Sequence, residues 1–192
     1  MDFIIETERL YLRELVASDD VGMFELDSDP EVHRFIENKP IQHIEESQEA
    51  IRYIQKQYAE NGIGRWAVLL KDSNTFIGWA GIKVEHNVNG KESFYDLGYR
   101  FIPKYWGKGY STEASKALVD YGFNTLKLPT ICAYAFTKHT ASRNVLKKVG
   151  LKEITSFFAD GDDNVWYEYD KADYDAANSW SKCIDFVLSF CK

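Results

Sequence analysis

Cysteine and histidine are scarce in this chain of 192 residues, and neither is arranged as a site. The sequence holds three cysteines and four histidines. Cys132, Cys183 and Cys191 have neither the spacing of a zinc site nor that of a disulfide framework. A chain with so few thiols is typical of a reducing compartment, so we expect a cytoplasmic protein without a structural disulfide. No metal site is predicted.

The sequence also lacks a long apolar run and an excess of positive charge. No stretch approaches the roughly 18 apolar residues of a membrane-spanning helix. The N-terminus, MDFIIETERL, is acidic and holds no apolar core of the kind that a secretory leader needs. The net charge of −7 argues against nucleic acid and suits a cationic substrate such as an amine. We therefore expect neither a membrane nor a nucleic acid as partner.

What remains is an ordinary globular composition with clear periodic segments. Apolar residues make up 45% and charged residues 28% of the chain, enough for the core of one domain. Asp29 before Pro30 predicts a helix start, and Asn61-Gly62 predicts a helix end. Residue periodicity predicts strands over 4–15, 65–70, 75–84, 94–101, 130–136, 152–158 and 165–169, helices over 18–26, 44–61, 140–149 and 174–192, a further helix beginning at 111 or 112, and polar turns over 85–91 and 160–164.

One stretch, from Tyr99 to Gly122, combines a strand end, a glycine-bearing turn and a helix start. Gly107 and Gly109 let the backbone adopt a positive φ and approach a ligand closely. The first amides of the following helix have no partner within the helix and lie at the positive end of its dipole. This order of elements predicts an anion site suited to a phosphate or pyrophosphate. The same pattern also occurs in tight turns that bind no ligand.

Neither common nucleotide motif accounts for these glycines. A dinucleotide loop needs a third glycine where Thr112 stands, and a Walker loop needs Ser or Thr where Gly109 follows Lys108. The run Trp106 to Ala114, WGKGYSTEA, instead resembles the acetyl-coenzyme A (acetyl-CoA) pyrophosphate loop of the GCN5-related N-acetyltransferases (GNAT), in their ribosomal-protein or RimJ/RimL-like branch. Lys104 stands where that loop carries Gln or Arg, and it keeps a positive charge.

Three further segments carry the resemblance, which covers residues 6–174. Residues 7–13, TERLYLR, resemble the family's first strand, and residues 96–99, DLGY, resemble its Glu-Ile-Gly-Tyr. Residues 139–151, HTASRNVLKKVGL, are similar to its Asn-x-x-Ser-x-x-Val-Leu-x-Lys-x-Gly-Phe. The resemblance implies an α+β (α/β layered) GNAT fold, with a mixed, mostly antiparallel sheet of about six to seven strands flanked by helices.

Residues 1–175 are assigned to this N-acetyltransferase domain, and residues 176–192 to an extra amphipathic helical tail that packs on the domain or dimerises. The fold implies that strands 94–101 and 130–136 splay apart, and that the arm of acetyl-CoA enters the gap and pairs with exposed backbone. Acetyl-CoA is the implied co-substrate. The residues expected to contact it are Phe101, Ile102, Lys104, Trp106, Gly107, Lys108, Gly109, Tyr110, Ser111, His139, Ser142 and Lys147, the lysines having solvated surface positions as the alternative.

Acetyl transfer requires a neutral amine, a donor to the oxyanion and a proton for the leaving thiolate. Many relatives supply that proton from a tyrosine, but Leu146 stands at the matching position. The resemblance points to Ser142 as the catalytic acid, although a serine in a first helical turn is commonly a local hydrogen-bond partner. His139 replaces the family's Asn. Glu85 and Asp96 are expected to bind the substrate or to serve the structure, and no general base is assigned.

The predicted reaction moves an acetyl group to a primary amine by direct attack in a ternary complex. A protein or peptide N-terminal α-amino group is favoured as acceptor because its pKa lies about 3 units below that of lysine. A small amine, such as an aminoglycoside or polyamine, is one alternative. A non-catalytic acyl-CoA-binding module is another. The chain is expected to be a monomer or a homodimer.

Overall fold

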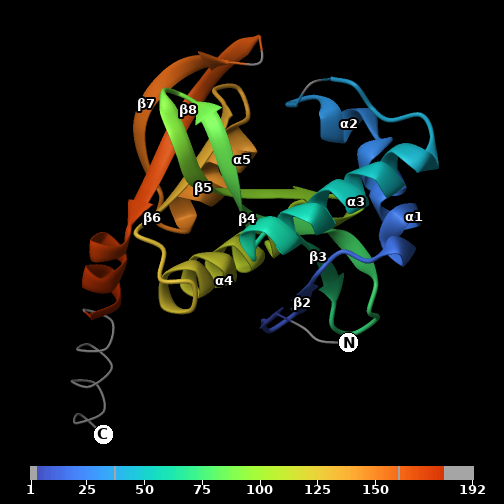
Figure 1. Ribbon diagram of the computed structural model, residues 1–192, viewed down its shortest axis with the longest axis horizontal. Coiled ribbons are helices and arrows are strands. Elements are labelled where there is room, and N and C mark those ends of the chain that lie inside the picture. Colours follow the sequence, from blue (N-terminus) through green and yellow to red (C-terminus); the bar gives the residue numbers. More distant parts are fainter. Residues whose placement is uncertain (1–3, 37, 160, 180–192) are drawn as a thin grey trace, which may run out of the picture.

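The computed structural model describes residues 4–36, 38–159 and 161–179, which form one eight-stranded sheet with helices on both faces (Figure 1). The strand order is β1-β2-β3-β4-β5-β6-β8-β7, and neighbours are antiparallel except β5 and β6, which run parallel. The predicted α+β fold is confirmed. The strands are β1 (Ile5–Glu6), β2 (Leu10–Arg13), β3 (Arg65–Leu70), β4 (Phe76–Val88), β5 (Lys91–Phe101), β6 (Thr130–Phe136), β7 (Lys152–Ala159) and β8 (Asp162–Asp170).

The helices start and end where the sequence signals place them. Asp29 accepts the backbone N–H of Glu31 at 2.8 Å and so caps α2. Gly62, at φ +70°, ends α3 as a left-handed cap. The predicted range 44–61 for that helix is confirmed. The helices are α1 (Asp20–Asp27), α2 (Pro30–His33), α3 (Ile44–Asn61), α4 (Tyr110–Asn124) and α5 (Thr140–Lys148), with short 3-10 turns at Ala17–Asp19 and Pro103–Tyr105.

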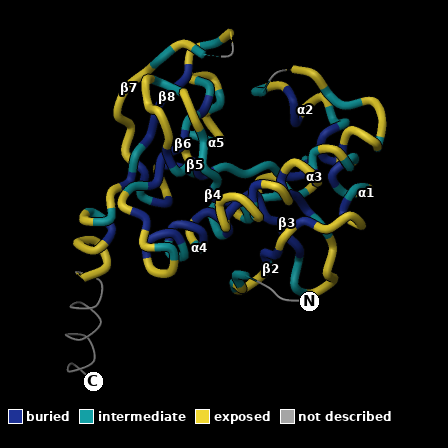
Figure 2. Tube along the Cα trace, viewed as in Figure 1, coloured by how far each residue is buried: buried dark blue, intermediate teal, exposed yellow. Residues whose placement is uncertain are grey.

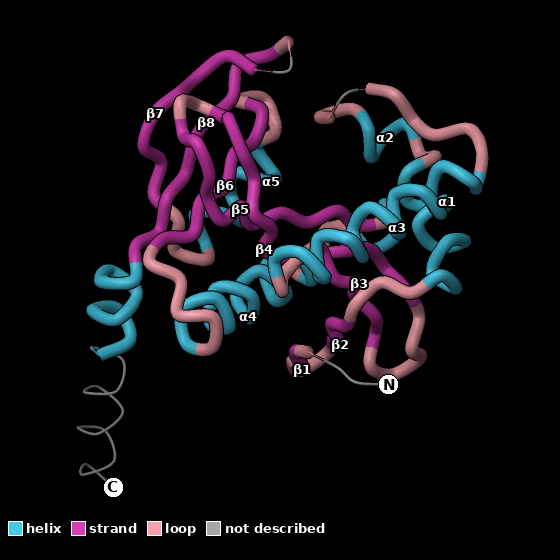
Figure 3. The backbone as a smooth tube through the Cα atoms, in the orientation of Figure 1, coloured by secondary structure: helices cyan, strands magenta, loops and turns pink. Residues whose placement is uncertain are grey.

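Two hydrophobic cores lie on opposite faces of the sheet, because successive strand residues point to opposite sides. In β3, Trp66 and Val68 pack in the core that α4 and α5 cover, whereas Ala67 and Leu69 pack in the core that α1 and α3 cover. Figure 3 shows these helices around the sheet, and Figure 2 shows the buried positions concentrated between them. The sheet is therefore the middle layer, and sites on its two faces draw on different helices.

The turn predicted over 85–91 is wrong. Strand β4 continues to Val88, and β5 begins at Lys91, directly opposite it. Only Asn89-Gly90 is left as the turn, and both residues have positive φ, as a two-residue hairpin requires. The polar residues of this segment hid the strand, because they lack the alternation that a core contact imposes. Glu85 consequently lies in β4, opposite Phe94, rather than in a loop.

The predicted first strand over 4–15 is instead the hairpin of β1 and β2. Thr7 makes the turn: its N–H donates to Leu10 C=O at 3.0 Å, and its Oγ1 accepts Leu10 N–H at 2.9 Å. The loop predicted over 160–164 is shorter, because β8 begins at Asp162. The last hairpin thus holds more strand than the periodicity suggested, and the first hairpin holds less.

Residues 171–179 are helical, and Tyr174 fixes them to the domain by packing on Phe123 and donating its hydroxyl to Asp120 at 2.8 Å. The predicted apolar stripe of the tail, which starts at Trp180, lies outside the described residues, as do Cys183 and Cys191. Among the described helices, none is long and apolar enough to cross a bilayer.

Candidate functional site

Strands β5 and β6 touch at one position and diverge on either side of it. Their parallel pairing consists of Asp96 opposite Cys132. On the C-terminal side, Ile102 N–H donates to Ile77 C=O at 3.0 Å, so the alternation of the antiparallel ladder turns the N–H and C=O of Tyr99 and Phe101 away from β4. These groups face the gap. They form an exposed strand edge inside the sheet, which an extended ligand can pair with.

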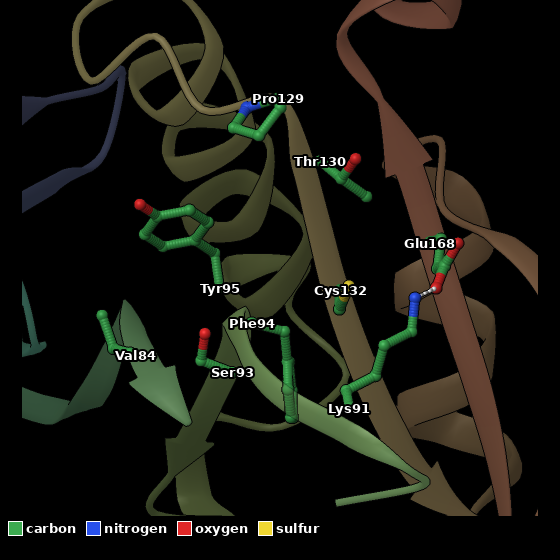
Figure 4. Close-up of a pocket in the computed structure, with 9 residues that line it drawn as sticks. All are labelled: Val84, Lys91, Ser93, Phe94, Tyr95, Pro129, Thr130, Cys132 and Glu168. Atoms are coloured by element: carbon green, nitrogen blue, oxygen red, sulfur yellow. Dashed lines mark ion pairs between the residues drawn. The ribbon is translucent and has the colours of Figure 1, made fainter. Parts of the chain in front are cut away.

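On the N-terminal side of this pinch lies a cavity of about 270 Å³ (Figure 4). Lys91 of β5 and Glu168 of β8 form an ion pair at 3.0 Å across it, and Phe94 lines it from β5. Burial raises the pKa of the Cys132 thiol to about 12, so the thiol is protonated and unreactive at neutral pH. None of the predicted site residues lines this cavity, so the candidate site is the gap on the other side.

The glycine turn at the end of that gap has the geometry of an anion site. Gly107 and Gly109 have φ of +72° and +84°, which side chains rarely adopt, and a Cβ on Gly107 would meet only open space. The first bond of α4 runs from Glu113 N–H to Gly109 C=O at 3.0 Å. The amides of Tyr110 and Ser111 therefore precede the hydrogen-bonded ladder, at the positive end of the helix. The loop fits a pyrophosphate.

Residues of the first hairpin hold this loop in place, which the sequence did not reveal. Glu113, in the first turn of α4, accepts the Thr7 hydroxyl at 2.6 Å, the Arg9 N–H at 2.9 Å and the Arg9 Nε–H at 2.6 Å. Arg9 also donates from its guanidinium to Lys108 C=O at 3.0 Å and lies 4.6 Å from the centre of the Tyr110 ring. The loop and the first turn of α4 are thereby tied to the turn between β1 and β2.

This anchor depends on pH. Partial burial pushes the pKa of Glu113 upward, but the hydrogen bonds from Thr7 and Arg9 outweigh it and hold the pKa below its usual value. A lowered folded-state pKa means that the stabilisation is present above the unfolded-state pKa of about 4.3 and is lost as the pH falls through the folded-state value. At acid pH, α4 therefore loses its charge-assisted bonds to the turn between β1 and β2.

We expect Glu113→Gln to lower the free energy of unfolding by about 1–2 kcal/mol at pH 7, because the charge-assisted bonds weaken. The difference from the wild type should shrink between pH 5 and pH 3, where the wild type loses the same contribution. Urea unfolding across this range measures it. Glu6→Gln, which removes an exposed ion pair with Lys71, is the control and should cost less than 1 kcal/mol. A difference that does not vary with pH would contradict the anchor.

The lysines predicted to meet phosphate have different surroundings. Lys104 pairs with Glu25 of α1 at 2.6 Å, and Lys147 pairs with Glu153 of β7 at 3.1 Å. Lys108 lies in the loop itself, 5.5 Å from the centre of the Tyr105 ring. Of the three, Lys108 is thus the one that the turn carries directly to the candidate anion site.

Two residues predicted to contact acetyl-CoA, Phe101 and Trp106, form a hydrogen bond with each other at the end of β5. The indole N–H of Trp106 donates to Phe101 C=O at 2.6 Å, although the Trp106 side chain is nearly half exposed. Phe101 and Ile102 are themselves buried. Trp106 thus covers the last carbonyl of the exposed edge, and the Phe101 N–H remains turned toward the gap.

The glycine turn allows a matched test. Gly107→Ala and Gly90→Ala both place a side chain at φ +72° in open space, so both should cost roughly 1–2 kcal/mol of stability. Only Gly107→Ala puts a methyl group in the predicted pyrophosphate loop, so only it should weaken acetyl-CoA binding, by about tenfold or more. Calorimetric titration of both variants measures this. Equal affinities would show that the turn binds nothing.

Ser142 meets a tyrosine that sequence reasoning passed over. Tyr99 of β5 donates its hydroxyl to Ser142 C=O at 3.1 Å, and the same hydroxyl lies 3.1 Å from Ser142 Oγ. Burial raises the pKa of Tyr99 above its usual value, so the hydroxyl stays protonated at neutral pH. Leu146 is buried in the core, as its apolar character requires. Tyr99 lies on the same face of β5 as Leu97, but nothing in the sequence indicated its partner.

His139 is the N-cap residue of α5, on the side of the gap formed by β6 and α5. Its ring stacks on that of Phe35, which follows α2, with 4.4 Å between ring centres and 13° between ring planes. Burial lowers the pKa of His139, so the ring is neutral at pH 7.

The two predicted substrate carboxylates are both paired in the structure. Asp96 forms a buried ion pair with Arg65, which also donates to Asp96 C=O at 2.7 Å. A Cβ on Gly98 would lie 2.5 Å from the Arg65 guanidinium, so the glycine of this motif makes room for the pair. Glu85 pairs with Lys83, which keeps its pKa below the usual value against the effect of burial. In the described ranges, no three His, Cys, Asp or Glu side chains gather closely enough to hold a metal ion.

Comparison with known proteins identifies the family. Residues 9–152 match the model of the acetyltransferase (GNAT) domain, and the chain belongs to this family. YoaA of Bacillus subtilis, an uncharacterized N-acetyltransferase, is 32% identical over 150 residues, which cover 78% of this chain and 83% of that protein. A GNAT-family acetyltransferase from Bacillus anthracis superposes with a TM-score of 0.74 at 26% identity, over 88% of this chain and 98% of the other.

A third relative carries the name of the co-substrate. The FsC-acetyl coenzyme A-N(2)-transacetylase of Aspergillus fumigatus is 28% identical over 159 residues, 80% of this chain and 67% of that protein. The family uses acetyl-CoA, and the chain is an acyltransferase, an N-acetyltransferase at the level of the family.

Proposed function

We propose that this enzyme acetylates a primary amine with a low pKa, in the first place a protein or peptide N-terminal α-amino group, as a RimJ/RimL-like member of its family. The observation that carries the proposal is the contact between Tyr99 and Ser142 beside the gap, 3.1 Å between hydroxyl oxygens. It supports the proposal because acetyl transfer needs an acid, and this contact supplies a pair of hydroxyl groups beside the strand edge. No strong base is needed for an acceptor that is partly neutral at pH 7.

The co-substrate is held at two places. The amides of Gly107 to Ser111 receive the pyrophosphate, with Lys108 beside them. The backbone edge of Tyr99 and Phe101 pairs with the amide groups of the pantetheine arm, which acts as an additional strand. Single contacts at a helix N-terminus contribute only about 0.3–2 kcal/mol, so the loop and the strand edge must act together for useful affinity.

The residues of the site then act together in one acetyl transfer. The amine nitrogen forms a bond to the acetyl carbon as the carbon–sulfur bond breaks, and the amine releases its proton to water. Ser142 donates a proton to the leaving thiolate and recovers one from water. Tyr99 orients Ser142 and holds its hydroxyl in the hydrogen-bonded state. A backbone N–H of the β5 edge stabilises the charge that develops on the acetyl oxygen.

The test is a calorimetric titration with acetyl-CoA, desulfo-CoA and S-acetylpantetheine, which lacks the pyrophosphate, followed by thiol-release assays on amines. We expect binding that weakens when phosphate is removed, and turnover on peptides with free N-termini that exceeds turnover on lysine side chains. Turnover confined to small amines would refute the α-amino acceptor. Tight binding without turnover on any amine would show a non-catalytic acyl-CoA-binding module.

A further inference from the structure

Phe35 and His139 join two walls of the site that come from distant parts of the chain. Phe35 follows α2, on the side of the molecule formed by α1, α2 and α3, and His139 begins α5 on the other side (Figure 1). Their rings stack at 4.4 Å between centres. Rings at that separation are in van der Waals contact, so nothing passes between them. The stack therefore joins the turn after α2 to the start of α5.

The backbone is held on both sides of the stack. His139 N–H donates to Phe136 C=O at 2.8 Å, and its own C=O accepts Arg143 N–H at 3.1 Å, so the start of α5 fixes its backbone. Phe35 lies in the turn after α2, which Ile36 N–H closes by donating to His33 C=O at 3.0 Å, and the Arg34 guanidinium lies 5.3 Å from the Phe35 ring centre. The Phe35 side chain is half-buried, so a change of its rotamer, rather than a movement of the backbone, is the step that opens the stack.

The stack lies next to the proposed chemistry. His139 precedes Ser142 by less than one helical turn, and Ser142 contacts Tyr99. Arg100, the next residue of β5, pairs with Asp27 of α1 at 2.5 Å, which ties the α1–α2 wall to the strand that carries Tyr99. An acceptor that approaches Ser142 from the side of α2 therefore meets the Phe35 ring before it meets the reacting groups.

We propose that Phe35, closing on His139, sets the size limit of the acceptor, and that it selects primary amines whose amine-bearing carbon has at most a small substituent. This inference rests on the proposed function. A small group passes beneath a slightly displaced Phe35 ring, whereas a bulky one requires the stack to open completely. For peptides, the class is an N-terminus that begins with Gly or Ser rather than with Leu or Phe.

The experiment compares wild type and Phe35→Ala on peptides that differ only in their first residue, Gly, Ser, Leu or Phe. We expect the wild type to prefer the peptides that begin with Gly or Ser by at least tenfold in kcat/KM. Phe35→Ala should reduce that preference at least tenfold, mainly by raising kcat/KM for the peptides that begin with Leu or Phe. Phe35→Leu keeps bulk without a ring face, so its preference should lie between those of the wild type and Phe35→Ala. It replaces the alanine variant if that variant folds poorly.

Two measurements separate this inference from its foundation. The affinity of Phe35→Ala for acetyl-CoA should equal that of the wild type, since Phe35 stacks at the start of α5 and the proposed pyrophosphate loop precedes α4. Phe158→Ala, which removes a ring that is 72% exposed on β7, is the matched control and should leave the preference unchanged. An unchanged preference in Phe35→Ala, with turnover intact, overturns the role of Phe35 alone. Absence of turnover in the wild type on every amine overturns the proposed function and this inference with it.

Discussion

Ser142→Ala and Tyr99→Phe are each expected to lower kcat by about 10²–10⁴-fold, the usual contribution of a positioned acid. The Tyr99 hydroxyl lies 3.1 Å from both oxygens of Ser142, so removing it releases the serine from its hydrogen-bonded orientation. Because the two groups act as a unit, the double variant should be little slower than the slower single variant. Steady-state thiol release measures kcat, and calorimetry should show unchanged affinity for acetyl-CoA.

Tyr95→Phe is the matched control for this pair. Tyr95 lies on the same face of β5, but on the far side of the pinch, where it lines the cavity of Figure 4. Its loss of a hydroxyl should leave kcat unchanged. Full activity in Ser142→Ala would refute the assignment of Ser142 as the acid, and strictly additive losses in the double variant would refute the coupling between Ser142 and Tyr99.

Asp96→Ala should destabilise the protein by about 3–5 kcal/mol, because it leaves the Arg65 charge buried without a partner. Arg65 and Asp96 are 7% and 6% exposed, and Arg65 also bonds Gly81 C=O at 2.5 Å. Replacing both residues with apolar ones, Arg65→Met and Asp96→Leu, should recover most of the loss. Urea unfolding of the three proteins measures the effect.

The alternative role predicted for Asp96 gives a different result. If its carboxylate bound the acceptor, Asp96→Asn would raise KM and leave the unfolding midpoint unchanged. Glu85→Gln is the comparison, since Glu85 was predicted to bind the substrate in the same way but forms a partly exposed pair with Lys83. That substitution should cost less than 1 kcal/mol.

Much of the fold was accessible from the sequence because local signals agree with it. The range of α3 follows from the apolar spacing that includes Ile51 and Ile54 and from the glycine that ends it. The glycine turn before α4 follows from residue order alone. Such features depend on chemistry within a few residues, which a single sequence records.

The parts of the site that the sequence did not predict are contacts between segments far apart in the chain. Glu113 reaches Arg9 across 104 residues, and Tyr99 reaches Ser142 across 43. Each residue was visible in a motif, but its partner depends on how the strands pair, and a single sequence carries no record of that pairing. The buried ion pair of Arg65 and Asp96 was missed for the same reason, and the space left by Gly98 became meaningful only beside it.

The single pairing position between β5 and β6 divides the enzyme's equipment between two parts of one sheet. The part ending in β5 carries the glycine turn and its anchor to the turn between β1 and β2, and the part beginning with β6 carries Ser142 and His139. If the co-substrate binds as proposed, as an extra strand between β5 and β6, it also joins these two parts of the sheet. Assembly of the reaction centre and retention of the co-substrate become one event, so a ligand that grips only the loop would bind without bringing the two parts into working alignment.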